Sequence, residues 1–259
     1  MTLARRLCAL IEVDERGRPA RPYSRGGLDA TFVEAVAAFL VQDGIDEVWL
    51  RASPTKVAPD IKLLFDVLHT LEERVFAPLV AWAPIASPAD ARLLLSFGAD
   101  RVVVDVHRGL PDPVAFIARI VEATGHDRVV AAVHARRMVT EKAELAFELV
   151  DPGGDGTDLS ALVLIDQLQH VGAAEILLVP QKGSIEQGRV RHDGDLIERA
   201  SSTLSIPLLS HADEADVADL ATPLLMGADG VVSGLVGGGR PPLPEVRRAL
   251  TEYGVPLRS

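Results

Sequence analysis

Short apolar runs alternate with amphipathic stretches along the whole chain. The runs are apolar at nearly every position, which is typical of parallel strands buried on both faces. They are Leu7–Val13, Glu47–Ala52, Pro78–Trp82, Arg101–Asp105, Arg128–His134, Glu175–Val179, Pro207–His211 and Gly230–Ser233. The stretches between them have helical spacing and are Ala30–Gln42, Asp60–Arg74, Pro88–Phe97, Pro113–Ala123, Leu159–Val171, Asp195–Ser202, Glu214–Met226 and Pro244–Tyr253. Eight such alternations favour an α/β fold closed as a (β/α)8 TIM barrel over an open, doubly wound sheet.

The chain also repeats itself at about half its length. Gly98–Val104 recurs as Gly227–Ser233, and Ala77–Trp82 recurs at the same offset as Ile206–His211. Each matching piece contains a predicted strand, so the repeat predicts two equivalent half-barrels that share one core. Matching positions of the two halves should therefore surround a common site.

Composition supports a single domain over residues 1–259, with half-barrels at about 1–125 and 126–259. The length is near the roughly 250 residues typical of such a barrel. The hydrophobic fraction is 48%, which is enough for a large core. A net charge of −11 without a basic stripe argues against a nucleic-acid partner. No apolar run reaches the roughly 18 residues that span a membrane, and we interpret the amino terminus as structure rather than signal peptide.

The single Cys8 excludes an internal disulfide and is typical of a protein in the reducing cytoplasm. It lies in an apolar run, which favours burial over nucleophilic chemistry. No G-x-G-x-x-G fingerprint follows the first predicted strand, and no H-x-H or H-E-x-x-H spacing indicates a metal site. We therefore expect neither a cofactor nor a metal.

Chemistry is expected at the carboxyl ends of the predicted strands, where barrel enzymes keep their catalytic residues. The residues at or just after these ends are Glu12, Arg51, Trp82, Asp105, His134, Gln181 or Lys182, His211 and Ser233. Glu12 and His134 end the first and fifth strands and should face each other across the barrel, where a carboxylate and an imidazole can serve as base and acid. The alternative is structural, with an ion pair between Glu12 and Arg51 and a His134 that bonds to a loop.

Two long loops, Asp14–Leu28 and Val139–Asp158, occupy equivalent places in the two halves and should rise over this mouth. A glycine-rich segment, Gly234–Arg240, follows the last strand, where barrels often bind phosphate on backbone N–H groups. Gly237 and Gly238 are therefore candidate phosphate ligands, although a flexible connector explains the glycines equally well.

Several segments resemble the cyclase subunit of imidazole glycerol phosphate synthase, and the resemblance runs from about residue 5 to the carboxyl terminus. They are Arg5–Val13, Asp46–Leu50, Ser87–Leu94, Gly98–Val102, Gly172–Leu178 and Tyr253–Arg258. The resemblance implies a two-fold repeated (β/α)8 barrel of the histidine pathway, a lyase that works in an amidotransferase complex. It also implies that the family's general acid and base, two aspartates, are replaced here by Glu12 and His134.

The mouth departs from the family pattern almost everywhere. Trp82-Ala83-Pro84 stands where the family has a phosphate-binding glycine run; Pro84 has no N–H to donate, and Trp82 fills the space. Residues at positions that the family uses at its mouth are Arg21, Arg51, Trp82, Asp105, Lys182, Ser210 and His211. Together with Ser233, Gly237 and Gly238, which are candidates from their place at or after the last strand, they are the predicted substrate-binding residues. We therefore expect a small-molecule substrate other than the histidine-pathway bisphosphate, and whether it carries phosphate stays open.

The opposite end of the barrel keeps the family pattern. In the family a ring of charges gates an ammonia channel from a glutaminase subunit, and its positions match Arg6, Glu47, Arg101 and Glu175 here. Asp100 matches a family residue that faces the glutaminase. The alternative is a plain salt-bridged layer that closes the barrel end, because charge at strand starts indicates stability.

Two classes of function remain open. One is an enzyme that uses ammonia from a glutaminase partner on a substrate other than the histidine-pathway bisphosphate. The other is a non-catalytic homologue that acts as a partner or regulatory subunit. Loss of the phosphate cradles is compatible with both classes, whereas Glu12 and His134 favour the enzyme. An ordinary cyclase of histidine biosynthesis ranks third, because its ligand carries two phosphates and neither cradle is intact. Fold alone names no substrate.

Overall fold

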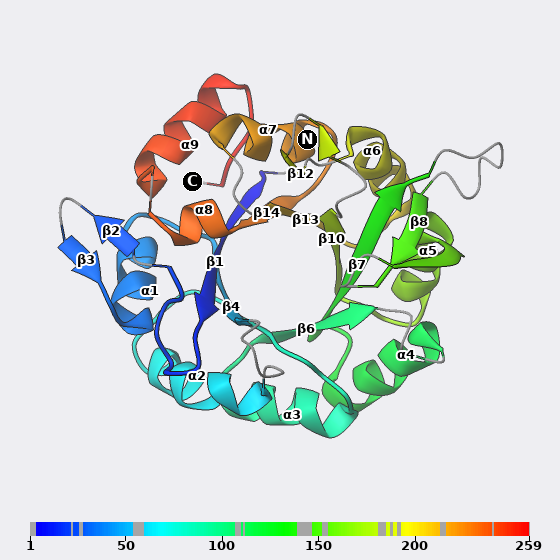
Figure 1. Ribbon diagram of the computed structural model, residues 1–259, viewed down its shortest axis with the longest axis horizontal. Coiled ribbons are helices and arrows are strands. Elements are labelled where there is room, and N and C mark those ends of the chain that lie inside the picture. Colours follow the sequence, from blue (N-terminus) through cyan, green and yellow to red (C-terminus); the bar gives the residue numbers. More distant parts are fainter. Residues whose placement is uncertain are drawn as a thin grey trace.

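A ring of strands enclosed by helices makes up the protein (Figure 1). The structure is a computed structural model. It describes residues 4–21, 23–25, 28–53, 60–106, 110, 112–138, 147–151, 155–180, 185–186, 189–190, 193–212, 216–239 and 241–258.

Eight parallel strands close into a barrel, as the apolar runs predicted. They are β1 (Arg6–Val13), β4 (Glu47–Ala52), β5 (Leu79–Trp82), β6 (Arg101–Val106), β7 (Val129–Arg137), β10 (Glu175–Pro180), β13 (Leu208–Ala212) and β14 (Gly230–Ser233). Their order is β10-β13-β14-β1-β4-β5-β6-β7, and parallel pairing of β7 with β10 closes the circle. The (β/α)8 barrel is therefore confirmed. The two-fold half-barrel repeat is compatible with this arrangement and stays a prediction.

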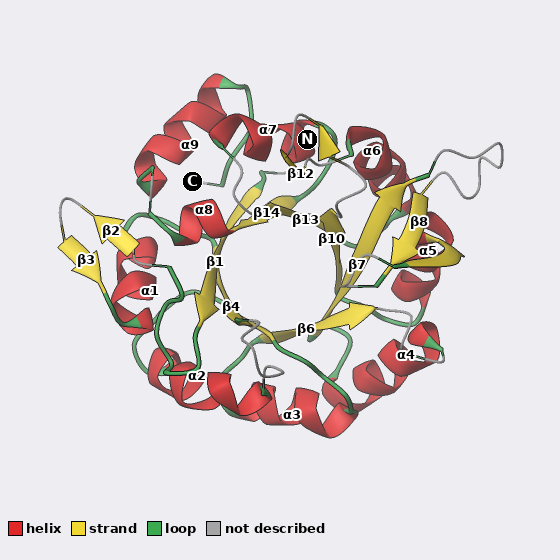
Figure 2. Cartoon of the chain, in the orientation of Figure 1, coloured by secondary structure: helices red, strands yellow, loops and turns green. Residues whose placement is uncertain are grey.

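Helices cover the outside of the sheet (Figure 2). They are α1 (Val33–Gln42), a 3-10 turn η1 (Ile61–Leu64) with α2 (Phe65–Glu72), α3 (Pro88–Ser96), α4 (Pro113–Thr124), α5 (Ala161–His170), α6 (Gly194–Thr203), α7 (Val217–Leu225), the short α8 (Gly234–Gly237) and α9 (Leu243–Glu252). Ser160 and Asp216 accept hydrogen bonds from first-turn N–H groups, so α5 and α7 begin later than their sequence patterns predicted. Among the described residues, no helix combines the length and apolar character needed to cross a membrane.

The repeated Gly-x-Asp pattern builds the turns that lead into the strands. Gly44, Gly98 and Gly227 have positive φ, a conformation that other residues adopt only with strain. The aspartates two residues later accept backbone N–H groups of a neighbouring strand: Asp46 from Leu7 at 2.8 Å, Asp100 from Leu79 at 2.8 Å and Asp229 from Leu208 at 3.0 Å. The internal repeat thus encodes a device that sets where adjacent strands begin.

Alternate strand residues point into the barrel and form an inner core, separate from the core between sheet and helices. The inner core is Cys8, Leu10, Trp49, Val80, Trp82, Val103, Val130, Ala132, Leu177, Val179, Leu209 and Val232. The same alternation directs Arg6 inward at the start of β1 and Glu12 inward at its end. One strand face therefore contributes to both ends of the barrel.

The two long segments predicted as loops contain strands. In the first, β2 (Tyr23–Arg25) pairs with β3 (Leu28–Ala30); in the second, β8 (Phe147–Val150) pairs with the end of β7 and with β9 (Gly156–Ser160). A further hairpin joins β11 (Ile185–Glu186) to β12 (Arg189–Val190). The prediction that the fifth strand ends at His134 was wrong, because β8 provides hydrogen-bond partners that extend β7 to Arg137.

Candidate functional site

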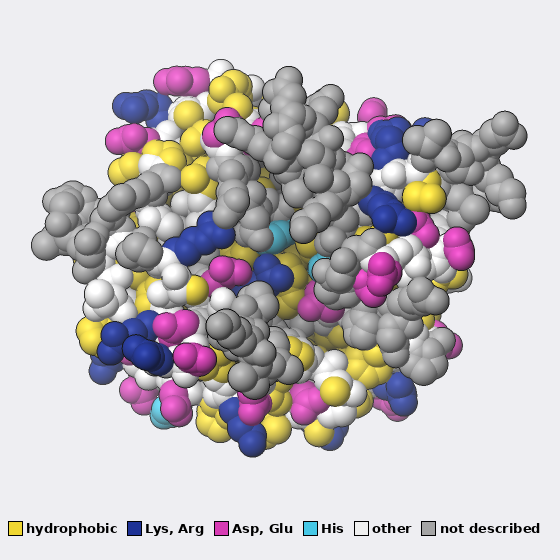
Figure 3. Space-filling view, viewed as in Figure 1, with side chains coloured by type: hydrophobic (Ala, Val, Ile, Leu, Met, Phe, Trp, Pro, Cys, Tyr) yellow, Lys and Arg dark blue, Asp and Glu magenta, His cyan; other side chains and the backbone are white. Residues whose placement is uncertain are grey.

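Glu12 and His134 lie on opposite sides of the barrel mouth. Their strands, β1 and β7, are separated by three strands in either direction around the sheet. Both residues are in step with inner-core positions, Leu10 on β1 and Ala132 on β7. The side chain of Glu12 is 21% exposed, whereas His134 is buried. Figure 3 shows basic, acidic and histidine side chains gathered at the centre of one face of the barrel.

Arg51 connects Glu12 to the middle of the mouth. Its Nη1 lies 3.9 Å from Glu12 Oε1, so the structural alternative of a Glu12–Arg51 ion pair is present in the folded chain. The guanidinium carbon also lies 4.4 Å from the ring centroid of Trp82. A guanidinium over an indole is a favourable cation–π contact. Arg51 thus contacts both Glu12 and Trp82.

Asp105 connects Trp82 to His134. Its Oδ2 accepts a hydrogen bond from Trp82 Nε1 at 3.0 Å, and its Oδ1 lies 2.8 Å from His134 Nε2. Burial opposes ionisation of Asp105, but the hydrogen bonds from His134 and Trp82 and the positive charge of Arg51 outweigh it. The pKa of this carboxyl therefore lies below its ordinary value, and it is a carboxylate at neutral pH.

The indole of Trp82 extends across the barrel axis. Its ring makes an edge-to-face contact with His211, with the centroids 5.2 Å apart and the planes at 79°. His211 comes from β13, which is the strand opposite β5 in the closed sheet. Both side chains are buried. Trp82 therefore forms the floor of the mouth and occupies space that an extended ligand would need.

The contacts follow five successive strands around half of the barrel. Side chains of β1, β4, β5, β6 and β7 contribute in turn Glu12, Arg51, Trp82, Asp105 and His134. The sequence identified all five residues as candidates but did not pair Asp105 with His134. The sequence did contain a signal for this pairing. Asp105 and His134 each lie two residues after an inner-core residue, and their strands, β6 and β7, are neighbours in the barrel.

Ser210 and Ser233 are not brought to this cluster. Ser210 alternates with the inward-facing Leu209 and His211, and it lines a crevice with Leu196 and Ile197 of α6. Ser233 is fully buried, and its hydroxyl accepts the backbone N–H of Leu235 at the start of α8. Ser233 was a candidate because it ends a strand and Ser210 because of the family resemblance; both face away from the barrel interior, because successive strand residues face opposite sides of the sheet.

Arg21, Gly237 and Gly238 line one small cavity together with Glu12, between β1, the first loop and α8. Gly237 has a structural reason of its own, since a Cβ there would lie 1.9 Å from the carbonyl oxygen of Leu10. The glycine-rich segment is thus a short helix packed tightly on β1 rather than a flexible connector. Lys182 and Gln181 lie outside the described residues.

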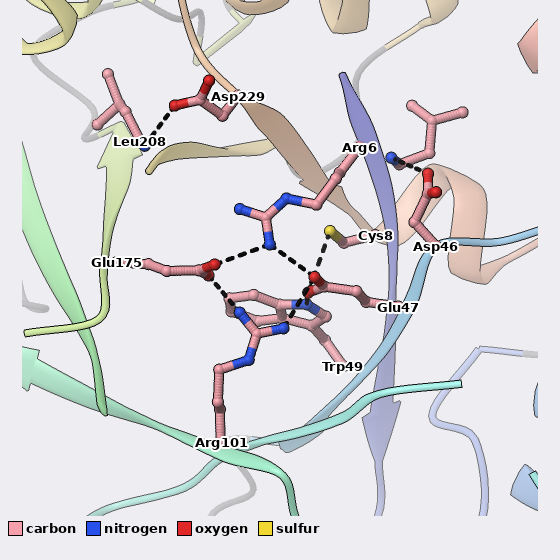
Figure 4. Close-up of polar contacts among 10 residues, drawn as sticks. Arg6, Cys8, Asp46, Glu47, Trp49, Arg101, Glu175, Leu208 and Asp229 are labelled. Carbon is pink, nitrogen blue, oxygen red and sulfur yellow. Dashed lines mark hydrogen bonds and ion pairs between the residues drawn. The ribbon is translucent and has the colours of Figure 1, made fainter. Parts of the chain in front are cut away.

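At the other end of the barrel, Arg6, Glu47, Arg101 and Glu175 converge into a closed ring of alternating charges (Figure 4). Arg6 Nη1 lies 2.7 Å from Glu47 Oε1 and 2.8 Å from Glu175 Oε1. Arg101 completes the ring with contacts of 2.8 Å to Glu47 and 2.7 Å to Glu175. Burial disfavours these charges, but the opposite charges raise the pKa of both arginines and lower that of Glu47.

Asp100 lies beside the ring without joining it. The residue is exposed, and one carboxylate oxygen accepts the backbone N–H of Leu79. Inside the ring, Trp49 Nε1 donates to Glu47 Oε2 at 3.0 Å. Within the part of the chain that the structure describes, no group of three His, Cys, Asp or Glu side chains is arranged to hold a metal.

Comparisons with known proteins identify the family of the chain. A family model described as histidine biosynthesis protein matches residues 36–236. The chain is 30% identical over 262 residues to the imidazole glycerol phosphate synthase subunit HisF of Streptomyces griseus. It is 29% identical to the HisF subunit of Streptomyces coelicolor and 28% identical to that of Bifidobacterium adolescentis. Each alignment covers 100% of both chains.

Proposed function

The chain belongs to the histidine biosynthesis protein family, and from this premise we propose that it is a HisF-like cyclase- or synthase-type lyase subunit. In this proposal it uses ammonia from a glutaminase partner on a substrate other than the histidine-pathway bisphosphate. The observation that carries the enzyme reading is a carboxylate and an imidazole facing each other across the mouth, Glu12 on β1 and His134 on β7.

The two residues would divide the proton transfers. Glu12 beside Arg51 stands as the anion, and His134 on the other side of the substrate takes or returns the second proton. A small molecule bound between them would have Glu12 on one side and His134 on the other. Arg51 is 25% exposed at the side chain and is placed to contact an acidic group of that molecule.

We expect the histidine-pathway bisphosphate to bind weakly or not at all. Trp82 lies across the floor of the mouth with its ring against Arg51 and His211, and Pro84 offers no N–H to a phosphate. Isothermal calorimetry with that bisphosphate checks the prediction, with the Streptomyces griseus HisF subunit as the positive control. A low-micromolar dissociation constant for this chain would support the third candidate, an ordinary cyclase of histidine biosynthesis.

A second candidate is a non-catalytic partner or regulatory subunit. The buried Trp82 favours it, because an indole held by Asp105, Arg51 and His211 leaves little room above the inner core. Incubation with heavy-isotope ammonium and a metabolite extract of the native organism separates the two candidates. Isotope incorporation that depends on Glu12 and His134 supports the enzyme, and its absence at every ammonium concentration supports the non-catalytic subunit.

The proposed glutaminase would dock on the end of the barrel that carries the charged ring. Phe76 lies at this end, in the segment between α2 and β5, and is 94% exposed. An aromatic side chain with so much exposed surface is a suitable anchor for a protein partner. The ring and the exposed Asp100 supply the polar surroundings.

Affinity capture from a lysate of the native organism tests this docking. We expect an amidotransferase-type glutaminase to co-purify with the unsubstituted protein and to be lost, at least tenfold, with Phe76→Glu, since about 1.4 kcal/mol of binding energy is a factor of ten. Phe32→Glu is the matched control, because Phe32 is also exposed but precedes α1 at the opposite end of the barrel. If no amidotransferase is captured by either protein, the partner claim should be dropped.

A further inference from the structure

Asp105 holds two side chains at once through its two oxygens. Trp82 Nε1 lies 3.0 Å from Oδ2, and an indole nitrogen can only donate. His134 Nε2 lies 2.8 Å from Oδ1. An ionised carboxylate can only accept hydrogen bonds, so the imidazole nitrogen that faces it must carry a hydrogen.

We infer that Asp105 is a positioning residue that fixes the imidazole of His134 in the Nε2–H tautomer. The inference rests on the proposed function, in which His134 transfers a proton. A carboxylate that holds a histidine in one tautomer and one orientation is a recurrent support for proton transfer.

Because Trp82 also donates to residue 105, the tautomer of His134 depends on whether that residue is an aspartate or an asparagine. An asparagine at position 105 would present one accepting oxygen and one donating NH₂ group. Because Trp82 Nε1 can only donate, both hydrogen bonds are kept only if the amide oxygen faces Trp82 and the NH₂ faces His134. The NH₂ group needs an accepting nitrogen, so Asp105→Asn should convert His134 to the Nδ1–H tautomer.

The ring nitrogen signals of His134 in nuclear magnetic resonance spectra report the tautomer directly. The chain has 7 histidines, and His134→Gln identifies the signals of this one. At a pH where the ring is neutral, we expect the Nε2–H form in the unsubstituted protein and the Nδ1–H form in Asp105→Asn. A Trp82→Phe replacement added to Asp105→Asn keeps an aromatic ring but removes the N–H. The amide can then turn either group toward His134, so the share of the Nδ1–H form should fall below that in Asp105→Asn.

An unsubstituted protein in the Nδ1–H form would overturn the inference, and so would an unchanged tautomer in Asp105→Asn or a double variant in which the share of the Nδ1–H form does not fall. If Asp105→Asn does not fold, the spectrum of the unsubstituted protein still decides. The measurement needs no substrate. The expected tautomers in a protein that never incorporates ammonia would therefore refute the proposed function while leaving Asp105 as the residue that positions His134.

Discussion

Replacing Glu47 by glutamine should lower the free energy of unfolding by about 3–5 kcal/mol, the usual cost of removing one partner from a buried ion pair. Glu47 Oε1 lies within 2.7 Å of Arg6 and 2.8 Å of Arg101, and Glu47 Oε2 accepts the N–H of Trp49. Without this carboxylate, the buried guanidinium of Arg6 and the half-buried one of Arg101 share Glu175 alone. Guanidinium chloride unfolding of both proteins at neutral pH measures the difference.

The same experiment has an internal check in its pH dependence. The pKa of Glu47 is lowered in the folded protein, so its contribution to stability is complete above the ordinary carboxyl pKa of about 4.3 and is lost as the pH falls through the lower folded value. The difference between Glu47→Gln and the unsubstituted protein should therefore stay constant near neutrality and shrink only below about pH 4.

Asp127→Asn is the matched control for the ring. Asp127 lies 3.7 Å from Arg128, but its side chain is 83% exposed, and surface ion pairs contribute roughly 0–1 kcal/mol. If Glu47→Gln costs no more than this control, the ring does not hold the barrel end together. Its charges would then be explained better by contact with a partner.

The members of the charged ring could be named because their positions match the ring of the family that the chain resembles. Arg6, Glu47, Arg101 and Glu175 each begin a barrel strand, and Gly-x-Asp turns mark two of these starts, those at Glu47 and Arg101. Alternation then directs all four side chains to the interior. The resemblance therefore indicated the members of the ring, and alternation along the strands accounts for their convergence. Whether the ring serves a partner stays a prediction.

The mouth was less predictable because strand ends depend on the loops that follow. β7 continues past His134 since β8 folds back onto it, and the glycine-rich segment after β14 forms α8 instead of an open loop. Ser233 was assigned to the mouth by its place at a strand end and Ser210 by the family resemblance, but their neighbours in the alternation face inward. The pairing of Asp105 with His134 depends on the register of β6 against β7, which one sequence does not reveal.

The catalytic prediction concerns the pair that spans the mouth. Once the isotope experiment has identified a substrate, Glu12→Gln and His134→Ala should each lower the turnover number by roughly 10²–10⁴-fold, the usual contribution of a positioned acid or base. Glutamine keeps the size of Glu12 but cannot accept a proton. Alanine removes the imidazole that Asp105 holds at 2.8 Å.

Steady-state rates with saturating ammonium make the measurement independent of a glutaminase partner. His170→Ala is the control for loss of a histidine, because His170 ends α5 with its side chain 70% exposed and should leave turnover unchanged. Retained binding of the substrate with lost turnover would separate proton transfer from simple damage to the mouth. Near-normal turnover in both Glu12→Gln and His134→Ala would instead show that the pair is structural, with Glu12 serving only as the ion-pair partner of Arg51. In that case the acid and base of any reaction would have to be sought among the other ionisable side chains of the mouth, Asp105 and His211 first, because the inner core below them is apolar apart from the indoles and Cys8.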